Sequence, residues 1–150
     1  MMVHFLLLCD ESESFILEIQ LHGENTFLDF HRAIQSAMHF DTNYLASFWR
    51  TDDHWNKVSE ATLIDMDREG RLLMEDLTIR DWCRTKGQKF LYIFDYFTER
   101  SLFVKIMDID IMNADSSVFP KIVKIEGQRP LQLRTGEKYI DGLLDGFSTN

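Results

Sequence analysis

The fold is decided by residues 23–48, which read GENTFLDFHRAIQSAMHFDTNYLASF. Apolar side chains recur there at about 100° per residue, which predicts an amphipathic helix with one face in a core. Thr26 is a typical N-cap, and Asp29 places a carboxylate in the first turn, where the helix dipole favours negative charge. The helix is therefore expected to begin at Thr26. Its predicted core residues are Phe27, Phe30, Ile34, Ala37 and Met38.

Strands are expected on both sides of this helix. Residues 43–49 alternate in the manner of a strand. Residues 3–8 are apolar on both faces, which is typical of a central strand, whereas residues 15–21 alternate apolar with polar side chains. The polar loop 10–14 is short enough for a hairpin, so these two strands are expected to pair antiparallel.

The helix and the strand after it carry a family resemblance. Residues 26–38 read TFLDFHRAIQSAM, and an Asp41 turn then leads to YLASF at residues 44–48. This pattern resembles the root-inducing plasmid ORF-three-like family, whose members are also described as passenger proteins of an insertion element. The resemblance covers residues 3 to 130. It implies a fold, and an association with plasmids or mobile elements, but no reaction.

The second half of the chain predicts more sheet. Residues 89–96 and 102–112 are aromatic and β-branched runs that are expected to form a long hairpin, and residues 121–125 a last strand. Between the two halves, residues 78–87 have the capping signals of a short helix. The fold class is therefore α+β, with a mainly antiparallel sheet rolled around one principal helix. We expect one domain over residues 1–150, with about 136–150 as a loosely held tail or a short docking helix.

Composition limits the partners. The formal net charge of −9 repels a phosphate backbone, so nucleic acid is a poor candidate and a protein partner is expected. The apolar start is too short for a membrane span and lacks the basic flank of a signal peptide, which favours the cytoplasm. Cys9 and Cys83 have no metal-ligand spacing and are expected to be buried, reduced thiols. The sequence indicates no cofactor.

Four side chains are candidates for acid or base chemistry. Asp95 lies in an apolar strand and must be paired or at a site; Arg100, across the predicted turn, is its expected partner. His31 lies at the edge of the helix's apolar arc, where its ring can pack and bond outward. Asp108 and Asp110 alternate with isoleucines, so they share one strand face and are either exposed or a carboxylate pair.

A calcium loop is suggested by residues 65–76. Asp65, Asp67 and Glu69 stand at loop positions one, three and five, and Gly70 at six. Asp76, at position twelve, is shorter than the usual glutamate, and no long helix precedes the loop. We therefore expect an acidic turn without useful calcium affinity. Asp52, Asp53 and His54 are adjacent in sequence and are likewise expected to form a solvated turn.

The chain departs from the family pattern after Asp95. Typical members continue with Phe-Gly-Asp-Gly-Trp and a Glu-His pair, whereas this chain continues with YFTERSL at residues 96–102. The resemblance implies that a chemical site there, if the family has one, is lost here, with Asp95 kept as a structural acceptor. The leading hypothesis is a noncatalytic interaction or scaffolding module. The alternative is a metal-dependent or acid/base hydrolase whose carboxylates meet only in the fold.

Overall fold

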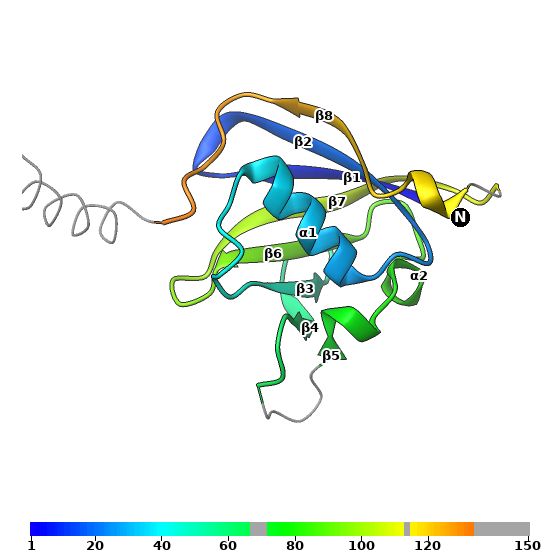
Figure 1. Cartoon of the computed structure of the whole chain (residues 1–150), viewed down its shortest axis with the longest axis horizontal. Coiled ribbons are helices and arrows are strands. Elements are labelled where there is room, and N and C mark those ends of the chain that lie inside the picture. The colour runs from blue at the N-terminus through cyan, green and yellow to red at the C-terminus, as the bar shows by residue number, and fades with distance from the viewer. Residues whose placement is uncertain (67–71, 113–114, 134–150) are drawn as a thin grey trace, which may run out of the picture.

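The computed structural model describes residues 1–66, 72–112 and 115–133, and these form an α+β fold built on one sheet (Figure 1). The predicted fold class is confirmed. The described strands are β1 (Met2–Cys9), β2 (Ser12–His22), β3 (Ser47–Thr51), β4 (Lys57–Thr62), β5 (Leu72–Leu73), β6 (Lys89–Asp95), β7 (Arg100–Asp110) and β8 (Lys121–Glu126). The described helices are α1 (Phe27–Met38), α2 (Ile79–Trp82) and the 3-10 turns η1 (Met74–Asp76) and η2 (Ser116–Val118).

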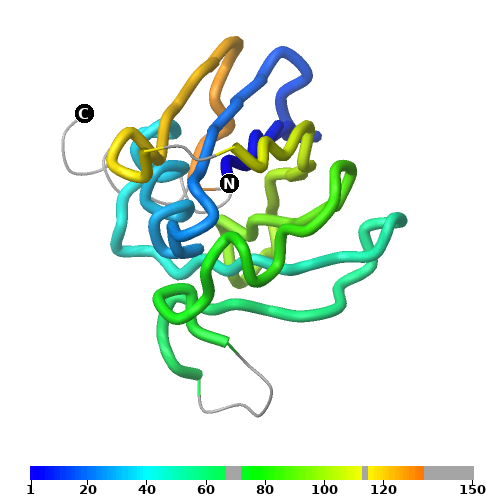
Figure 2. Tube along the Cα trace, turned by 90° about the vertical axis from the view of Figure 1, so that its right-hand side faces the viewer, coloured from blue at the N-terminus to red at the C-terminus, as the bar shows by residue number. Residues whose placement is uncertain are grey.

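The order of strands in the sheet is β5-β4-β3-β6-β7-β1-β2-β8. Neighbouring strands pair antiparallel, except that β4 and β5 are parallel. Both predicted hairpins, β1 with β2 and β6 with β7, are present. Figures 1 and 2 show the sheet curling around α1, which lies on its inner face. Strand β8 lies at an edge of the sheet beside β2.

The core lies between α1 and the inner face of the sheet. The apolar arc of α1 is buried as the sequence predicts, and its phenylalanines pack on rings from the strands. Phe30 lies 4.6 Å from Phe5 and 5.0 Å from Phe48, measured between ring centroids. Since each aromatic side chain buries a large apolar area, this cluster is the main stabilising contact between the helix and the sheet.

Both helices begin at a capping box. The Thr26 hydroxyl accepts a hydrogen bond from the Asp29 backbone N–H at 3.1 Å, and the Asp29 carboxylate accepts one from the Thr26 N–H at 2.9 Å. Thr78 and Asp81 make the same pair of bonds at α2. Each box satisfies two backbone donors that the first turn leaves free. The α2 helix is shorter than expected, because it ends at Trp82 instead of continuing toward Gly87.

Two strand predictions need correction. Residues 43–46 are not strand: β3 begins at Ser47, after a turn that follows Asp41. Strand β1 is interior in the sheet, as expected, but only one of its faces is buried, and Leu8 on the other face is 41% exposed. The side chains of β1 alternate between a buried and a more exposed face, but the sequence does not reveal this because both faces carry apolar residues.

No helix among the described residues is long and apolar enough to cross a membrane. The segment predicted as a tail or docking helix, about 136–150, lies outside the described residues.

Candidate functional site

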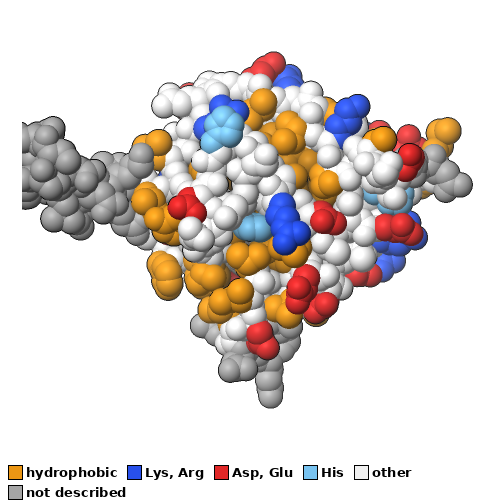
Figure 3. All heavy atoms as spheres, in the orientation of Figure 1, with side chains coloured by type: hydrophobic (Ala, Val, Ile, Leu, Met, Phe, Trp, Pro, Cys, Tyr) orange, Lys and Arg blue, Asp and Glu red, His pale blue; other side chains and the backbone are white. Residues whose placement is uncertain are grey.

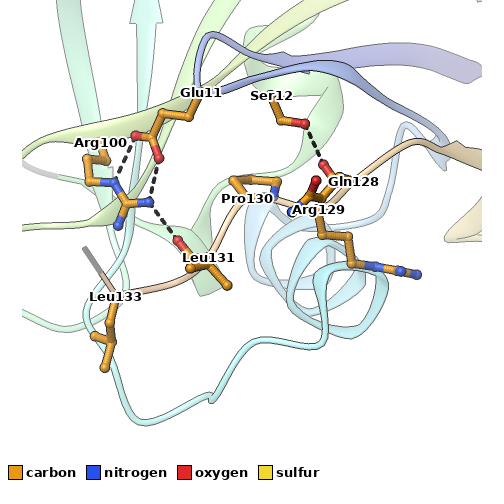
Figure 4. Close-up of a pocket in the computed structure, with 8 residues that line it drawn as sticks. All are labelled: Glu11, Ser12, Arg100, Gln128, Arg129, Pro130, Leu131 and Leu133. Carbon is orange, nitrogen blue, oxygen red and sulfur yellow. Dashed lines mark hydrogen bonds and ion pairs between the residues drawn. The ribbon is translucent and has the colours of Figure 1, made fainter. Parts of the chain in front are cut away.

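Arg100, the first residue of β7, is a buried guanidinium that joins three parts of the chain. Its Nε and Nη2 donate to the two carboxylate oxygens of Glu11, at 2.8 and 2.6 Å, and Nη1 donates to Asp95 at 3.4 Å. It also donates to the backbone carbonyl of Leu131 at 2.6 Å (Figure 4). A further bond goes to the backbone carbonyl of Gln132 at 3.0 Å. The hydrogen bonding of Arg100 to the Glu11 carboxylate is the main cause that raises the pKa of Arg100. The predicted pairing of Asp95 with Arg100 is present, and Glu11 is a closer partner that the sequence did not indicate.

A pocket of about 340 Å³ lies beside Arg100. It is bounded by Glu11, Ser12, residues 128–131 and Leu133, and Figure 4 shows the Glu11 carboxylate facing the guanidinium. A guanidinium has five N–H donors, and the five bonds above match that number. Arg100 therefore has no free donor for an anionic ligand, and we assign it a structural role.

Residues 127–133, here called the strap, are what Arg100 holds in place. Ser12 donates from its hydroxyl to the Gln128 carbonyl at 2.7 Å, and Arg129 donates from Nε to the Ala37 carbonyl at the end of α1 at 2.7 Å. The Gln132 side chain donates to and accepts from the Asp41 backbone, at 2.8 and 2.7 Å. The strap therefore ties the β1–β2 turn to the C-terminal end of α1.

His31 faces the core, so the expectation that it bonds outward is wrong. It is 4% exposed, and its Nδ1 lies 2.8 Å from the Tyr92 hydroxyl, which also accepts from the Gln35 amide at 2.6 Å. With Gln35 donating to the Tyr92 oxygen, the hydroxyl can donate to Nδ1 of a neutral imidazole. Burial lowers the pKa of His31 to about 4. The contact between His31 and Tyr92 could not be predicted from the sequence, because the two residues are distant in the chain.

Asp108 and Asp110 lie at the far end of β7 from Arg100. Asp108 is exposed opposite His4, whose ring instead contacts Glu18 at 2.6 Å, and Asp110 accepts from the Met112 backbone N–H at 2.9 Å. Arg100 and Asp108 are eight positions apart on one strand, roughly 26 Å at the usual rise. The fold does not bring Asp95 to these carboxylates.

The acidic loop lies partly outside the described residues. Asp67 and Glu69 lie outside the described residues, so the calcium prediction stays a prediction. Asp65 and Asp76 are described and exposed. No group of three His, Cys, Asp or Glu side chains within residues 1–66, 72–112 and 115–133 is placed to hold a metal ion.

Asp52 forms the predicted solvated turn. Its side chain accepts from the backbone N–H groups of His54 and Asn56 and from the Asn56 amide, at 2.8, 2.9 and 2.9 Å. The bond from the Asn56 side chain is the main cause that lowers the pKa of Asp52.

The surface that sequence reasoning missed is a groove between α1 and β8. It has a volume of about 340 Å³, and its walls come from one face of α1 and the start of β8. Figure 3 shows hydrophobic side chains between the regions that β8 and α1 occupy in Figure 1. The signals for an edge strand were present, because Pro120 precedes a short run with two lysines. The lining residues are Asp29, Arg32, Ala33, Ser36, Pro120 and Ile122.

Comparison with known proteins adds a fold and a family. A search of curated proteins finds no match. Among solved structures, the chain is similar to a protein of unknown function from Methanosarcina mazei Go1, with a TM-score of 0.62 and 17% identity, over 83% of this chain and 68% of that one. This likeness supports the fold. The model of the plasmid pRiA4b ORF-3-like proteins matches residues 7–137, and the chain belongs to that family.

Proposed function

We propose that the chain is a noncatalytic protein-interaction domain whose docking surface is the α1–β8 groove. The observation that carries the proposal is the position of β8: it has β2 on one side, and a groove against α1 opens beside it. A strand at a sheet edge presents backbone N–H and C=O groups to an extended chain, and a neighbouring groove accepts alternate side chains.

The hydrolase alternative needs the candidate acids and bases to converge. Asp95 is held by Arg100, His31 is neutral against Tyr92, and Asp108 lies at the other end of β7. Each side chain therefore has a separate position, and this dispersal favours the interaction domain.

A protein is the partner that we favour. The net charge of −9 opposes nucleic acid, since no counterions would be released from a phosphate backbone. We also propose a cytoplasmic location. Its support is that Cys9 and Cys83 are buried free thiols, a state that a reducing compartment maintains.

The test is selection of linear peptides of about ten residues, displayed at random, on the immobilised full chain. Enriched peptides are then titrated by calorimetry against the wild-type chain and against Ser36→Trp. Ser36 is exposed and lines the groove, so tryptophan there fills the groove without disturbing the core. We expect enriched peptides that bind the wild type and not the variant. If no peptide is enriched, the proposal is wrong.

A further inference from the structure

We propose that the partner contributes an acidic, extended segment, which adds a strand to the sheet along the edge of β8 that no described strand occupies. This inference rests on the proposed function and names the chemistry of its ligand. It is carried by three observations: the open edge, the alternation of side chains on β8, and the cations around the groove.

The dimensions of the groove fit a short strand. Strand β8 has six residues, or about 20 Å at the usual strand rise. The twelve residues of α1 extend over about 18 Å. Figure 1 shows β8 passing along α1 at the margin of the sheet. Pro120 precedes β8 and has no N–H to offer, so pairing is confined to the Lys121–Glu126 segment. An extended segment of about six residues therefore fills the edge.

The two faces of β8 differ in chemistry. Ile122 pairs with the buried Ile19, which places it on the inner face, where it lines the groove with Ala33 of α1. Lys121 and Lys124 pair with Gln20 and Glu18 on the outer face. Residues opposite one another in a sheet share a face.

A register shift leaves Val123 out of the pairing, so Lys121 and Lys124 share the outer face although they are three positions apart. A strand docked on β8 alternates its own side chains between the same two faces. Its inward side chains contact Ile122 and Ala33, so small apolar residues fit there. Its outward side chains lie near Lys121 and Lys124, where carboxylates form favourable cross-strand pairs. The expected ligand therefore alternates small apolar with acidic residues.

The charges around the groove favour this ligand. Arg32, on the α1 wall, and Lys121 are both exposed, and within the described part of the chain neither makes an ion pair. Lys124 has only long contacts, 3.9 Å to Glu18 and 3.7 Å to Glu126. Asp29 also lines the groove, but its carboxylate accepts from the Thr26 N–H. The three cations outnumber it, so the charge around the groove favours an acidic segment.

A second copy of this chain is a poorer occupant of the edge. Each copy carries a net charge of −9, so two copies repel one another over the whole surface. A short acidic segment brings its carboxylates to the lysines without that cost. The lysines also discourage nonspecific pairing at the edge, which is a common protection of exposed strands.

The experiment uses a fluorescent peptide of about ten residues that alternates glutamate and valine, titrated by anisotropy against the full chain. One control peptide carries lysine for each glutamate, and a second carries proline for two of the valines, which removes strand pairing. We expect binding of the acidic peptide alone, weakened by salt. The double variant Lys121→Glu/Lys124→Glu is expected to weaken binding by roughly tenfold or more. The matched control, Lys105→Glu, changes an exposed lysine of β7 and is expected to leave binding unchanged.

Several outcomes overturn the inference. Equal binding of the lysine peptide, or of the proline peptide, excludes acidic strand pairing. If selected peptides bind the chain and Ser36→Trp does not weaken their binding, the docking surface lies outside the groove. Strand addition to β8 is then wrong, whereas the chain remains an interaction domain with a different docking surface. Suppose that the acidic peptide does not bind, and that a synthetic peptide of residues 134–150 displaces the selected peptides from the groove. That result assigns the edge to residues 134–150 of the chain itself. If neither the alternating peptide nor any selected peptide binds, both proposals fail.

Discussion

Arg100 and Glu11 form a two-point ion pair between segments 89 positions apart in the chain, with N–O distances of 2.8 and 2.6 Å. The Arg100 side chain is 6% exposed and that of Glu11 is 38% exposed, so the pair lies where the strap meets the surface. Such a planar, bidentate pair fixes orientation as well as distance. It sets the position of the β1–β2 turn against the start of β7.

Replacing Arg100 with methionine is expected to destabilise the fold by about 3 kcal/mol, since Glu11, Asp95 and two strap carbonyls lose their donor together. Urea unfolding measures the difference. Glu99→Gln is the matched control, because its ion pair with Lys57 is exposed and is worth at most about 1 kcal/mol. Equal effects of the two substitutions would contradict a structural role for Arg100.

Asp95→Asn is expected to lower the melting temperature by about 3 °C, since its 3.4 Å bond to Arg100 is the weaker of the two carboxylate contacts. Peptide binding should be unchanged. Calorimetric melting and the anisotropy titration check the two parts. Full stability with lost binding or turnover would instead make Asp95 a functional residue, and the hydrolase hypothesis would lead.

Gly127→Ala is expected to cost about 3 kcal/mol or more. Gly127 has a φ of +78°, and an added Cβ would lie 2.0 Å from the Ser14 carbonyl oxygen, so the strap would have to leave the β1–β2 hairpin. Gly87 offers the control: its φ is +94°, but a Cβ there meets nothing within 4 Å. Gly87→Ala should therefore cost about 1 kcal/mol, from backbone strain alone. Urea unfolding of both variants gives the comparison.

Stability is expected to fall as the pH drops from about 6.5 to about 4, because His31 stays neutral in the folded chain. Its pKa is lowered from 6.5 to about 4, so in this window the unfolded chain binds a proton that the folded chain does not. The contribution is complete above pH 6.5 and amounts to about 3 kcal/mol across the window. The prediction is checked by measuring the free energy of unfolding over this pH range. His31→Gln is expected to flatten the curve, and His54→Gln, the control, to leave it unchanged. An NMR titration of His31 centred near pH 6.5 would refute it.

Both thiols are expected to resist alkylation in the folded protein. Cys9 and Cys83 are buried, and burial is the main cause that raises the pKa of each. Since the thiolate is the reactive form, iodoacetamide should label neither cysteine in native buffer and both in urea. Mass spectrometry counts the labels. A mass that is lower by two protons before labelling would reveal a disulfide and overturn the expectation of reduced thiols.

Local signals in the sequence predicted local structure well. Thr26 and Asp29 specified the start of α1, and apolar periodicity gave the buried residues of that helix and the two hairpins. These features depend on residues a few positions apart, so the sequence contains their causes.

Features that depend on distant pairing were missed. Glu11 meets Arg100, and Tyr92 meets His31, only because a turn and a helix from the first half of the chain pack against strands from the second half. The start of β3 was misplaced for a similar reason, since pairing with β4 and β6 begins at Ser47, beyond the alternation that starts at Asn43. The groove was missed for the same reason, because its two walls, α1 and β8, come from opposite halves of the chain.

The place of β1 in the sheet has a consequence for synthesis on the ribosome. This strand emerges well before one of its two neighbours, β7, which begins at Arg100. Until β6 appears, Phe5 also lacks the ring of Phe90, whose centroid lies 6.2 Å from its own. Pairing over such separations is slow, because a long loop must close before the contact forms. The apolar side chains of β1, β2 and α1 therefore stay without part of their core contacts until most of the sheet has been made, and in that interval they are open to aggregation.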